Sequence, residues 1–258
     1  MDNAVQEKTN GLSVFHLKII AYTTMLIDHI GAFVLDPYIA ANLETMGYQR
    51  MRILDFAYEA SRSIGRIAFP LFCFMLVEGL FHTKNRWRYL ARLLIFAVLS
   101  DIPFDLAYTG EWHSYQHQSV MITLSIAFLV LIAMEEIRKL RLPQFAVNLL
   151  QFVPVAAGCV IAYFVKCDYG FKGILVISAL YLLYPLLTID RGAYALAGGA
   201  LFMWEWVSKI SRVFGSLSFI TLLFYNGQKG KSAKWFFYFF YPVHLLILYF
   251  IRRALLGA

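Results

Sequence analysis

Long apolar runs separated by short polar stretches cover most of this chain of 258 residues. A membrane-spanning helix needs about 20 mainly apolar residues, whereas the strands of a membrane barrel alternate apolar and polar positions. The runs are continuous and do not alternate, so they predict helices. We expect an all-α transmembrane bundle of about nine to ten spans, forming a single domain over residues 1–258. The expected spans are Leu17–Leu35, Ile64–Phe81, Tyr89–Tyr108, Ser119–Met134, Phe145–Val165, Gly170–Ile189, Ala193–Val207, Val213–Tyr225 and Trp235–Ile251.

The composition points the same way. Hydrophobic residues make up 60% of the chain and charged residues 15%, and the mean hydropathy is +0.62. A soluble domain is about 45–50% apolar and about 25% charged. These values exclude a water-soluble domain, a disordered chain and a small disulfide scaffold. The first apolar run is expected to be a retained span and not a signal peptide, because no cleavage site follows it.

The basic residues lie between the apolar runs. The formal net charge is +7, and three basic clusters, Lys84–Arg92, Arg138–Arg141 and Lys229–Lys234, follow the second, fourth and eighth expected spans. All three fall on one side if the N-terminus is cytoplasmic, as the positive-inside rule requires. Arg252 and Arg253 depart from this pattern. We expect a multi-pass protein of the inner or plasma membrane, with the lipid bilayer and no nucleic acid as a partner.

Ionisable residues inside apolar runs are costly in a membrane and are candidates for function. The first run contains Asp28 and His29, and His29 shares a helix face with Lys18, Tyr22 and Met25. The two could instead form a polar pair that only fixes helix packing.

The second apolar run holds further ionisable groups. It opens with Arg66 and ends with Glu78. Arg66 should reach a depth comparable to that of the first-run pair and could contact it, or it could extend its guanidinium to the membrane interface. Pro70 should kink this helix and free a backbone carbonyl.

Polar candidates recur in the second half of the chain. Tyr241 and His244 share a face of the last run. Asp168 could bind substrate or pair with neighbouring lysines. His113 and His117 have the spacing of a zinc site only if their segment is helical. A solvated loop is the expected structure there, and no metal is predicted.

Two basic segments, Lys84–Arg92 and Lys229–Lys234, could cradle a polyanion such as the phosphates of a nucleotide. Membrane topology explains the same residues without a ligand. The chain contains no P-loop, GxGxxG or GxSxG motif.

Four segments carry a family resemblance. They are LKIIAYTTMLIDHIG, RSIGRIAFPLFCFMLVEGLFHTKNRWRYLARLLIFAVLSDIPFDL, DYGFKG and YNGQKGKSAKWFFYFFYPVHLL, which together extend from Leu17 to Leu246. In this order they resemble the TraX family, which is associated with N-terminal acetylation of F-type conjugative pilin and is similar to a wider group of membrane acyltransferases. Ser119 departs from the pattern, which has Asn at this position.

The resemblance implies roles for the matching residues. His29 would be the catalytic base, or would carry a transient acetyl group, and Asp28 would tune it. Acetyl-CoA would be the acyl donor, with no metal. The cofactor-binding residues would be Arg66, Arg86, Arg88, Arg92, Tyr225, Asn226 and Lys234, and the substrate-binding residues would be Glu78, Asp168, Tyr241 and His244.

The function implied is transfer of acetyl from cytoplasmic acetyl-CoA to an amine or hydroxyl acceptor, which could be a pilin peptide, a glycan or a small molecule. Two alternatives remain open. One is a proton-coupled secondary transporter with Asp28, His29 and Glu78 as relay groups. The other is a non-catalytic assembly factor for a conjugative pilus.

Overall fold

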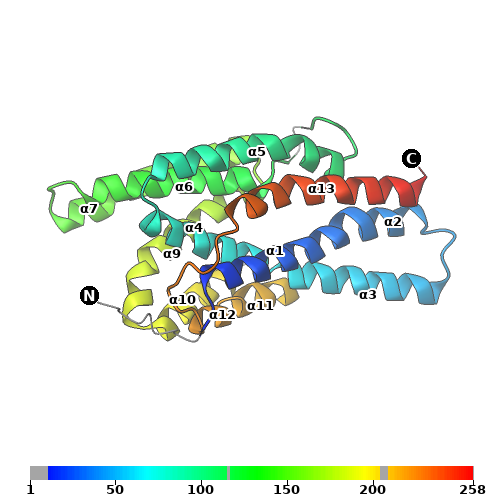
Figure 1. The fold of residues 1–258 in the computed structure, drawn as a ribbon, viewed down its shortest axis with the longest axis horizontal. Coiled ribbons are helices and arrows are strands. Elements are labelled where there is room, and N and C mark those ends of the chain that lie inside the picture. The colour runs from blue at the N-terminus through cyan, green and yellow to red at the C-terminus, as the bar shows by residue number, and fades with distance from the viewer. Residues whose placement is uncertain (1–10, 115–116, 204–208, 258) are drawn as a thin grey trace, which may run out of the picture.

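The computed structural model describes residues 11–114, 117–203 and 209–257, and for residues 209–212 it describes the backbone alone. Within these ranges the chain is helical and contains no strands, as the apolar runs predict. Figure 1 shows the helices lying mostly along one direction. In chain order they are α1 (Val14–Ile30), the π-helical turn η1 (Gly31–Leu35), α2 (Asp36–Ala41), α3 (Tyr48–Gly65), α4 (Ala68–His82), α5 (Arg86–Tyr108), α6 (Val120–Arg138), α7 (Gln144–Leu150), α8 (Phe152–Val165), α9 (Gly170–Ile189), α10 (Arg191–Met203), α11 (Lys209–Leu217), α12 (Ile220–Leu223) and α13 (Lys234–Leu256).

The described residues contain six helical segments that are long and apolar enough to cross a membrane, so the protein is a multi-pass membrane protein. The expected count of nine to ten spans is not confirmed. The expected spans Ala193–Val207 and Val213–Tyr225 correspond to short helices, and Val207 lies outside the described residues. The six segments are Val14–Ala41, Tyr48–His82, Val120–Arg138, Gln144–Val165, Gly170–Ile189 and Lys234–Leu256.

Helix α5 is long enough to cross a membrane but is not one of the six apolar segments. With 23 residues it is long enough to cross, at about 1.5 Å rise per residue. It packs against α6 on one side and α13 on the other, and exposes apolar side chains such as Val98 and Ile102. Charged residues along it, including Arg92, Asp101 and Asp105, distinguish it from the six apolar segments.

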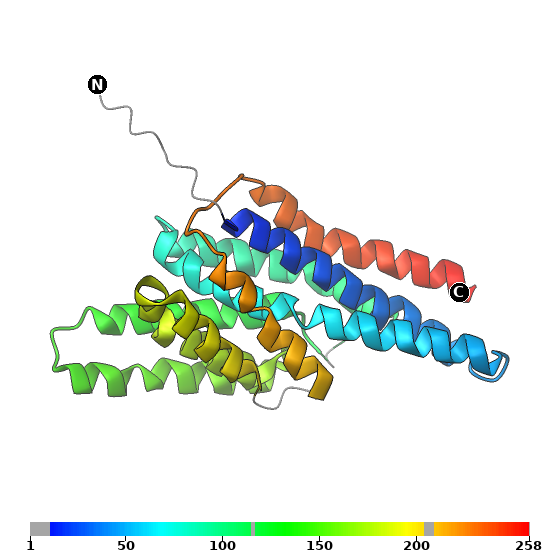
Figure 2. The ribbon, with the colours of Figure 1, turned by 90° about the horizontal axis from the view of Figure 1, so that it is seen from below.

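Helix α1 packs against α3, α4 and α13 (Figure 2). Two glycines allow α1 and α3 to approach closely. A Cβ at Gly65 would lie 2.2 Å from Cβ of Asp28, and one at Gly31 would lie 2.0 Å from Oγ of Ser61. Small residues at such crossings let helix backbones pack closely in a membrane.

The long segment Tyr48–His82 is interrupted at Arg66 and Ile67, between α3 and α4. Pro70 has no N–H to donate to the carbonyl of Arg66, so the helical ladder cannot continue there. The backbone tightens instead, and the N–H of Arg66 donates to Ser63 O at 3.2 Å. The helix is therefore interrupted one turn before Pro70.

Residues 224–234 wrap around the start of α1. The N–H of Leu12 donates to Phe224 O at 2.7 Å, and the N–H of Val14 donates to Gln228 O at 2.9 Å. The first backbone N–H groups of a helix have no acceptor within that helix. The carbonyl oxygen of Gln228 is the acceptor for the N–H of Val14, the first residue of α1. The arrangement fixes the lysines between residues 229 and 234 beside the N-terminal end of α1.

Candidate functional site

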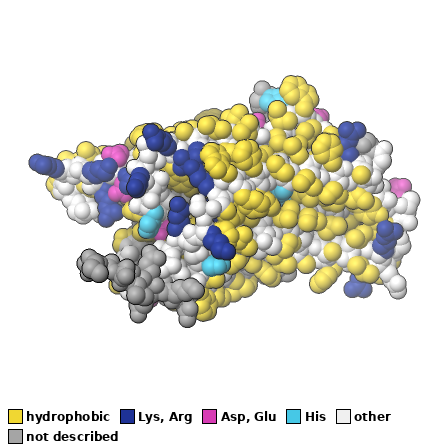
Figure 3. Space-filling view, viewed as in Figure 1, with side chains coloured by type: hydrophobic (Ala, Val, Ile, Leu, Met, Phe, Trp, Pro, Cys, Tyr) yellow, Lys and Arg dark blue, Asp and Glu magenta, His cyan; other side chains and the backbone are white. Residues whose placement is uncertain are grey.

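A cavity of about 490 Å³ opens among α1, α4, α5, α6, α13 and the segment 225–234. Among the described residues, five Lys and Arg side chains line it: Lys18, Arg92, Lys229, Lys231 and Lys234. Lys18 and Arg92 lie near the N-terminal ends of α1 and α5, Lys234 begins α13, and Lys229 and Lys231 lie in the segment that leads into α13. Figure 3 shows Lys and Arg side chains gathered on the left, at the end where Figure 1 places these helix starts. The cavity thus has a basic end.

From the basic end the cavity follows α1 inward. Its lining runs from Val14 to Met25 along this helix, a rise of roughly 16 Å at 1.5 Å per residue. Three members of the predicted α1 face, Lys18, Tyr22 and Met25, line it. On α13, Tyr241 also lines the cavity.

Tyr241 connects the cavity to a pair of histidines. Its ring centroid lies 6.3 Å from that of His29 and 5.5 Å from that of His244. The two imidazole rings are stacked at 5.0 Å with an interplanar angle of 7°. Nδ1 of His29 lies 2.7 Å from Nε2 of His244, within hydrogen-bond distance.

The surroundings of His244 determine which nitrogen of this pair carries the hydrogen. Nδ1 of His244 lies 2.8 Å from the carbonyl oxygen of Phe240, and a carbonyl only accepts, so Nδ1 donates. In the neutral ring Nε2 is then the acceptor, and it receives its hydrogen bond from Nδ1–H of His29. This leaves Nε2 of His29 with a free lone pair, the state that a general base requires.

Asp28 pairs with α3 and not with the adjacent His29. Its carboxylate forms an ion pair with Arg62 at 2.8 Å, and Arg62 also donates to the carbonyl oxygen of Asp28 at 3.4 Å. Arg66, expected near this pair, lies one turn further along the chain, and its buried Nε has no hydrogen-bond partner among the described residues. Arg62 therefore forms the ion pair with Asp28, and Arg66 lies close enough for its charge to act on both Asp28 and His29.

Glu78 is buried, with 5% of its surface exposed, and lines the cavity. It accepts hydrogen bonds from the hydroxyls of Tyr184 on α9 at 2.6 Å and of Tyr225 at 2.5 Å. A buried carboxylate needs such partners. The structure thus brings Glu78 and Tyr225 together as polar lining. Tyr184 lies in an apolar run, and no sequence signal singled it out.

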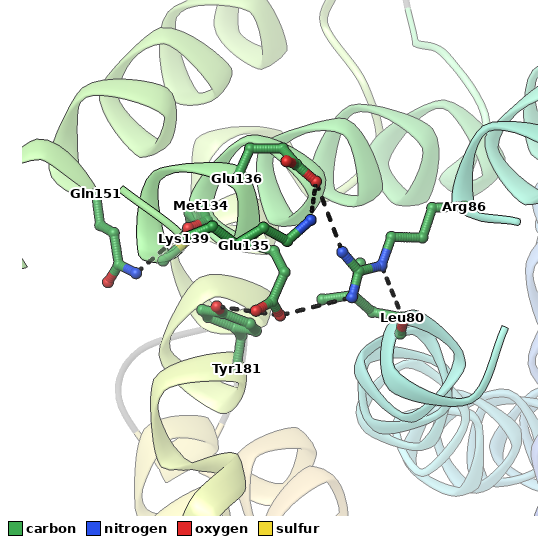
Figure 4. A network of polar contacts seen from close by, with 8 residues as sticks. All are labelled: Leu80, Arg86, Met134, Glu135, Glu136, Lys139, Gln151 and Tyr181. Carbon is green, nitrogen blue, oxygen red and sulfur yellow. Dashed lines mark hydrogen bonds and ion pairs between the residues drawn. The ribbon is translucent and has the colours of Figure 1, made fainter. Parts of the chain in front are cut away.

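The predicted phosphate ligands divide into two groups. Arg92 and Lys234 line the cavity. Arg86 does not: its guanidinium lies within 3.9 Å of Glu135 and 3.8 Å of Glu136 and donates to Leu80 O at 3.3 Å (Figure 4). Arg88 is exposed and, among the described residues, is absent from the cavity lining. Arg86 therefore joins the ends of α4, α5 and α6.

Asn226 and Asp168 lie away from the cavity lining. The side-chain oxygen of Asn226 accepts from the backbone N–H of Gln228 at 2.9 Å. The backbone N–H of Asn226 donates to Leu12 O at 2.9 Å, so this residue shapes the segment around α1. The N–H of Asp168 donates to Gln118 O at 2.9 Å. Part of the Asp168 side chain is accessible, but desolvation by the surrounding protein raises its pKa to about 6 against the opposing charge of Arg66.

These features define a multi-pass membrane protein with a basic-ended cavity that reaches Tyr241, next to a hydrogen-bonded histidine pair. The family model described as TraX protein matches residues 13–252, and the chain belongs to the TraX family. This confirms the resemblance drawn from the sequence motifs. The chain is similar to the probable fimbrial assembly protein FimC, serogroup H1, of Dichelobacter nodosus, with 30% identity over 257 residues covering 92% of this chain and 94% of that protein. No solved structure matches.

Proposed function

We propose that this protein is a membrane-embedded acyltransferase that moves an acetyl group from acetyl-CoA to an amine or hydroxyl acceptor. One observation carries the proposal: a single cavity leads from five basic side chains to Tyr241, whose ring contacts His29 and His244. Acetyl-CoA has phosphates at one end and the thioester at the end of a narrow arm, so its shape and charge suit this cavity. A volume of about 490 Å³ lies in the usual range of ligand pockets.

The basic end would hold the phosphates. Lys18, Arg92 and Lys234 line it together with Lys229 and Lys231, and charge-assisted hydrogen bonds to phosphate oxygens are strong. Lys18 was not among the cofactor ligands expected from the family. By the positive-inside rule this end faces the cytoplasm, where acetyl-CoA is available.

The reaction would take place at the inner end. Nε2 of His29 would take a proton from the acceptor nitrogen or oxygen as this atom attacks the thioester carbonyl. The carbon–sulfur bond breaks, CoA leaves as the thiolate, and the imidazolium returns the proton to that sulfur. An acetyl group carried transiently by His29 is the alternative route to the same products.

The acceptor would approach from the other side of His29. There the pair of Asp28 with Arg62 and the more distant Asp168 supply charges of both signs, which suit a polar acceptor. A pilin N-terminus fits the family and the printed name of the fimbrial relative. A glycan or a small molecule carries the same reactive groups.

A second candidate function is non-catalytic assembly of a pilus, which the name of the fimbrial relative favours. In that case His29 and His244 would serve helix packing, and acetyl-CoA would not be consumed.

Radiolabelled acetyl transfer separates the two functions. Purified protein in nanodiscs is given labelled acetyl-CoA with a synthetic pilin N-terminal peptide, and the label on the peptide and the CoA released are followed. We expect transfer by the wild type and by His16→Gln, which changes an exposed histidine outside the cavity lining, and loss in His29→Gln. If acetyl-CoA is neither bound nor consumed, the acyltransferase proposal fails. Normal piliation by His29→Gln cells would favour the assembly function.

A further inference from the structure

Three metal-ligating side chains meet at the end of α5, outside the cavity. Asp101 and Asp105 lie one helical turn apart on α5, and His113 lies in the loop that follows, which Figure 1 places at the periphery of the bundle. One ligand atom from each of the three lies within 4.8 Å of the others. None of the three lines the cavity, so this cluster is separate from the proposed acyltransferase site.

The loop is held against α5 by a contact that positions the histidine. Asp105 is 1% exposed, and its Oδ2 accepts a hydrogen bond from the backbone N–H of Ser114 at 2.7 Å. Ser114 directly follows His113, so this bond fixes the chain at the point where the imidazole leaves it. The side chain of Thr109 also bonds back to the carbonyl of Asp105 at 2.9 Å, which shapes the end of the helix.

Asp101 carries a buried oxygen that a bound cation would satisfy. Its Oδ1 is buried and has no hydrogen-bond partner among the described residues. Buried polar atoms are almost always paired, and two carboxylates side by side repel each other unless a proton or a cation lies between them. A cation held between Asp101 and Asp105 would satisfy the unpaired oxygen and remove the repulsion.

We propose that Asp101, Asp105 and His113 bind a divalent transition-metal ion, with Zn²⁺ the best fit. Zinc binds imidazole nitrogen and carboxylate oxygen in the same site, at metal–ligand distances of about 2.0–2.2 Å, and often has three protein ligands and one water. Donors in such a tetrahedral site lie about 3.4 Å apart, so modest side-chain rotation closes the observed cluster. Ca²⁺ and Mg²⁺ prefer sites in which every ligand atom is oxygen.

The ion would fasten the loop after α5 to that helix. The same loop continues to Gln118, whose backbone pairs with Lys166 and Asp168 before α9. The metal therefore links two connections on one side of the bundle. This role is independent of acetyl transfer.

Metal content tests the proposal directly. Full-length protein without an affinity tag is stripped with EDTA in detergent, dialysed against a slight excess of ZnCl₂ and measured by mass spectrometry of zinc. We expect close to one zinc ion per chain for the wild type. We expect binding weakened about tenfold or more, by competition with a zinc dye, for Asp101→Asn and His113→Gln.

Glu111→Gln is the matched control, because Glu111 is an exposed carboxylate of the same loop and is not part of the cluster. It should bind zinc as the wild type does. Zinc should also raise the melting temperature of the wild type and of this control, and leave that of Asp101→Asn unchanged. The proposal is overturned if the stripped wild-type protein takes up no zinc, which would mean that the two carboxylates share a proton. It is also overturned if Asp101→Asn and His113→Gln bind zinc as tightly as the wild type does.

Discussion

His29 and His244 form a hydrogen bond although 215 positions separate them in the chain. Neither contact of His244 involves a charged group: one nitrogen meets a backbone carbonyl and the other meets His29. His244 is thus placed to orient His29 and to keep its outer nitrogen unprotonated. The sequence assigned His244 to substrate binding, a role that stays a prediction, and gave no reason to pair the two rings.

The orienting role of His244 predicts a graded set of variants. His244→Ala removes the acceptor for His29 Nδ1–H, and we expect the rate constant of acetyl transfer to fall by about 10²-fold or more. His244→Gln retains a side-chain acceptor and should recover part of that loss with little change in KM. Steady-state kinetics with the pilin peptide provide the measurement. Equal losses in both variants, with KM raised, would instead indicate a substrate contact.

Glu78 predicts an effect on stability. Its carboxylate accepts from the hydroxyls of Tyr184 and Tyr225. Glu78→Gln replaces one accepting oxygen with an NH₂ group, which places a second donor against a tyrosine hydroxyl. We expect a loss of about 1–3 kcal/mol, seen as a lower melting temperature in detergent. Glu59→Gln, at an exposed position on α3, should change stability by less than about 0.5 kcal/mol. An unchanged melting temperature for Glu78→Gln would show that these hydrogen bonds contribute little.

At the scale of the helices, the crossing of α1 and α3 determines where the candidate catalytic residues lie. The absence of a side chain at Gly65 brings α3 against Asp28, so that Arg62 can pair with it. The break at Arg66 and Ile67 then redirects the chain into α4, which carries Glu78 to the cavity.

Gly65→Ala tests this crossing. The new methyl group would meet Cβ of Asp28 at 2.2 Å, and because that atom lies close to the backbone the helices must separate. We expect destabilisation of about 1–3 kcal/mol together with reduced acetyl transfer. Gly47→Ala is the control, since nothing lies within 4 Å of a Cβ at that helix start. A Gly65→Ala protein with wild-type melting and turnover would contradict the close approach.

At the scale of the whole molecule, the cavity exists only because elements distant in the chain meet. Its basic residues come from α1, α5 and the segment that leads into α13. Arg88 and Arg92 belong to one sequence cluster and one helix, yet only Arg92 lines the cavity in the described structure.

Because only Arg92 of these two arginines lines the cavity, we expect substitutions of Arg92 and Arg88 to have different effects on the affinity for CoA. Arg92→Gln should raise the Kd of CoA about tenfold, equivalent to about 1.4 kcal/mol, because a charge at the phosphates is lost. Arg88→Gln should change it by less than about twofold, since the side chain is exposed to solvent and screened by salt. Titration calorimetry in nanodiscs measures both. Equal effects of the two variants would mean that only the overall charge of this end attracts CoA.

The sequence by itself determined the helical membrane fold and the family, and it singled out Asp28, His29, Arg66 and His244 as polar groups within apolar runs. These follow from local properties, since each apolar run fixes its own helix and the ordered motifs are read directly from the chain. The expected number of spans is not confirmed, because the length of an apolar run does not reveal that α10, α11 and α12 are short.

Only the tertiary structure decided which of these groups meet. It paired Asp28 with Arg62, His29 with His244, and Arg86 with acidic residues of α6. It also brought Asp101 and Asp105 together with His113. The physical reason is that such contacts depend on helix crossings, set by small residues and by side-chain packing between segments far apart in the chain.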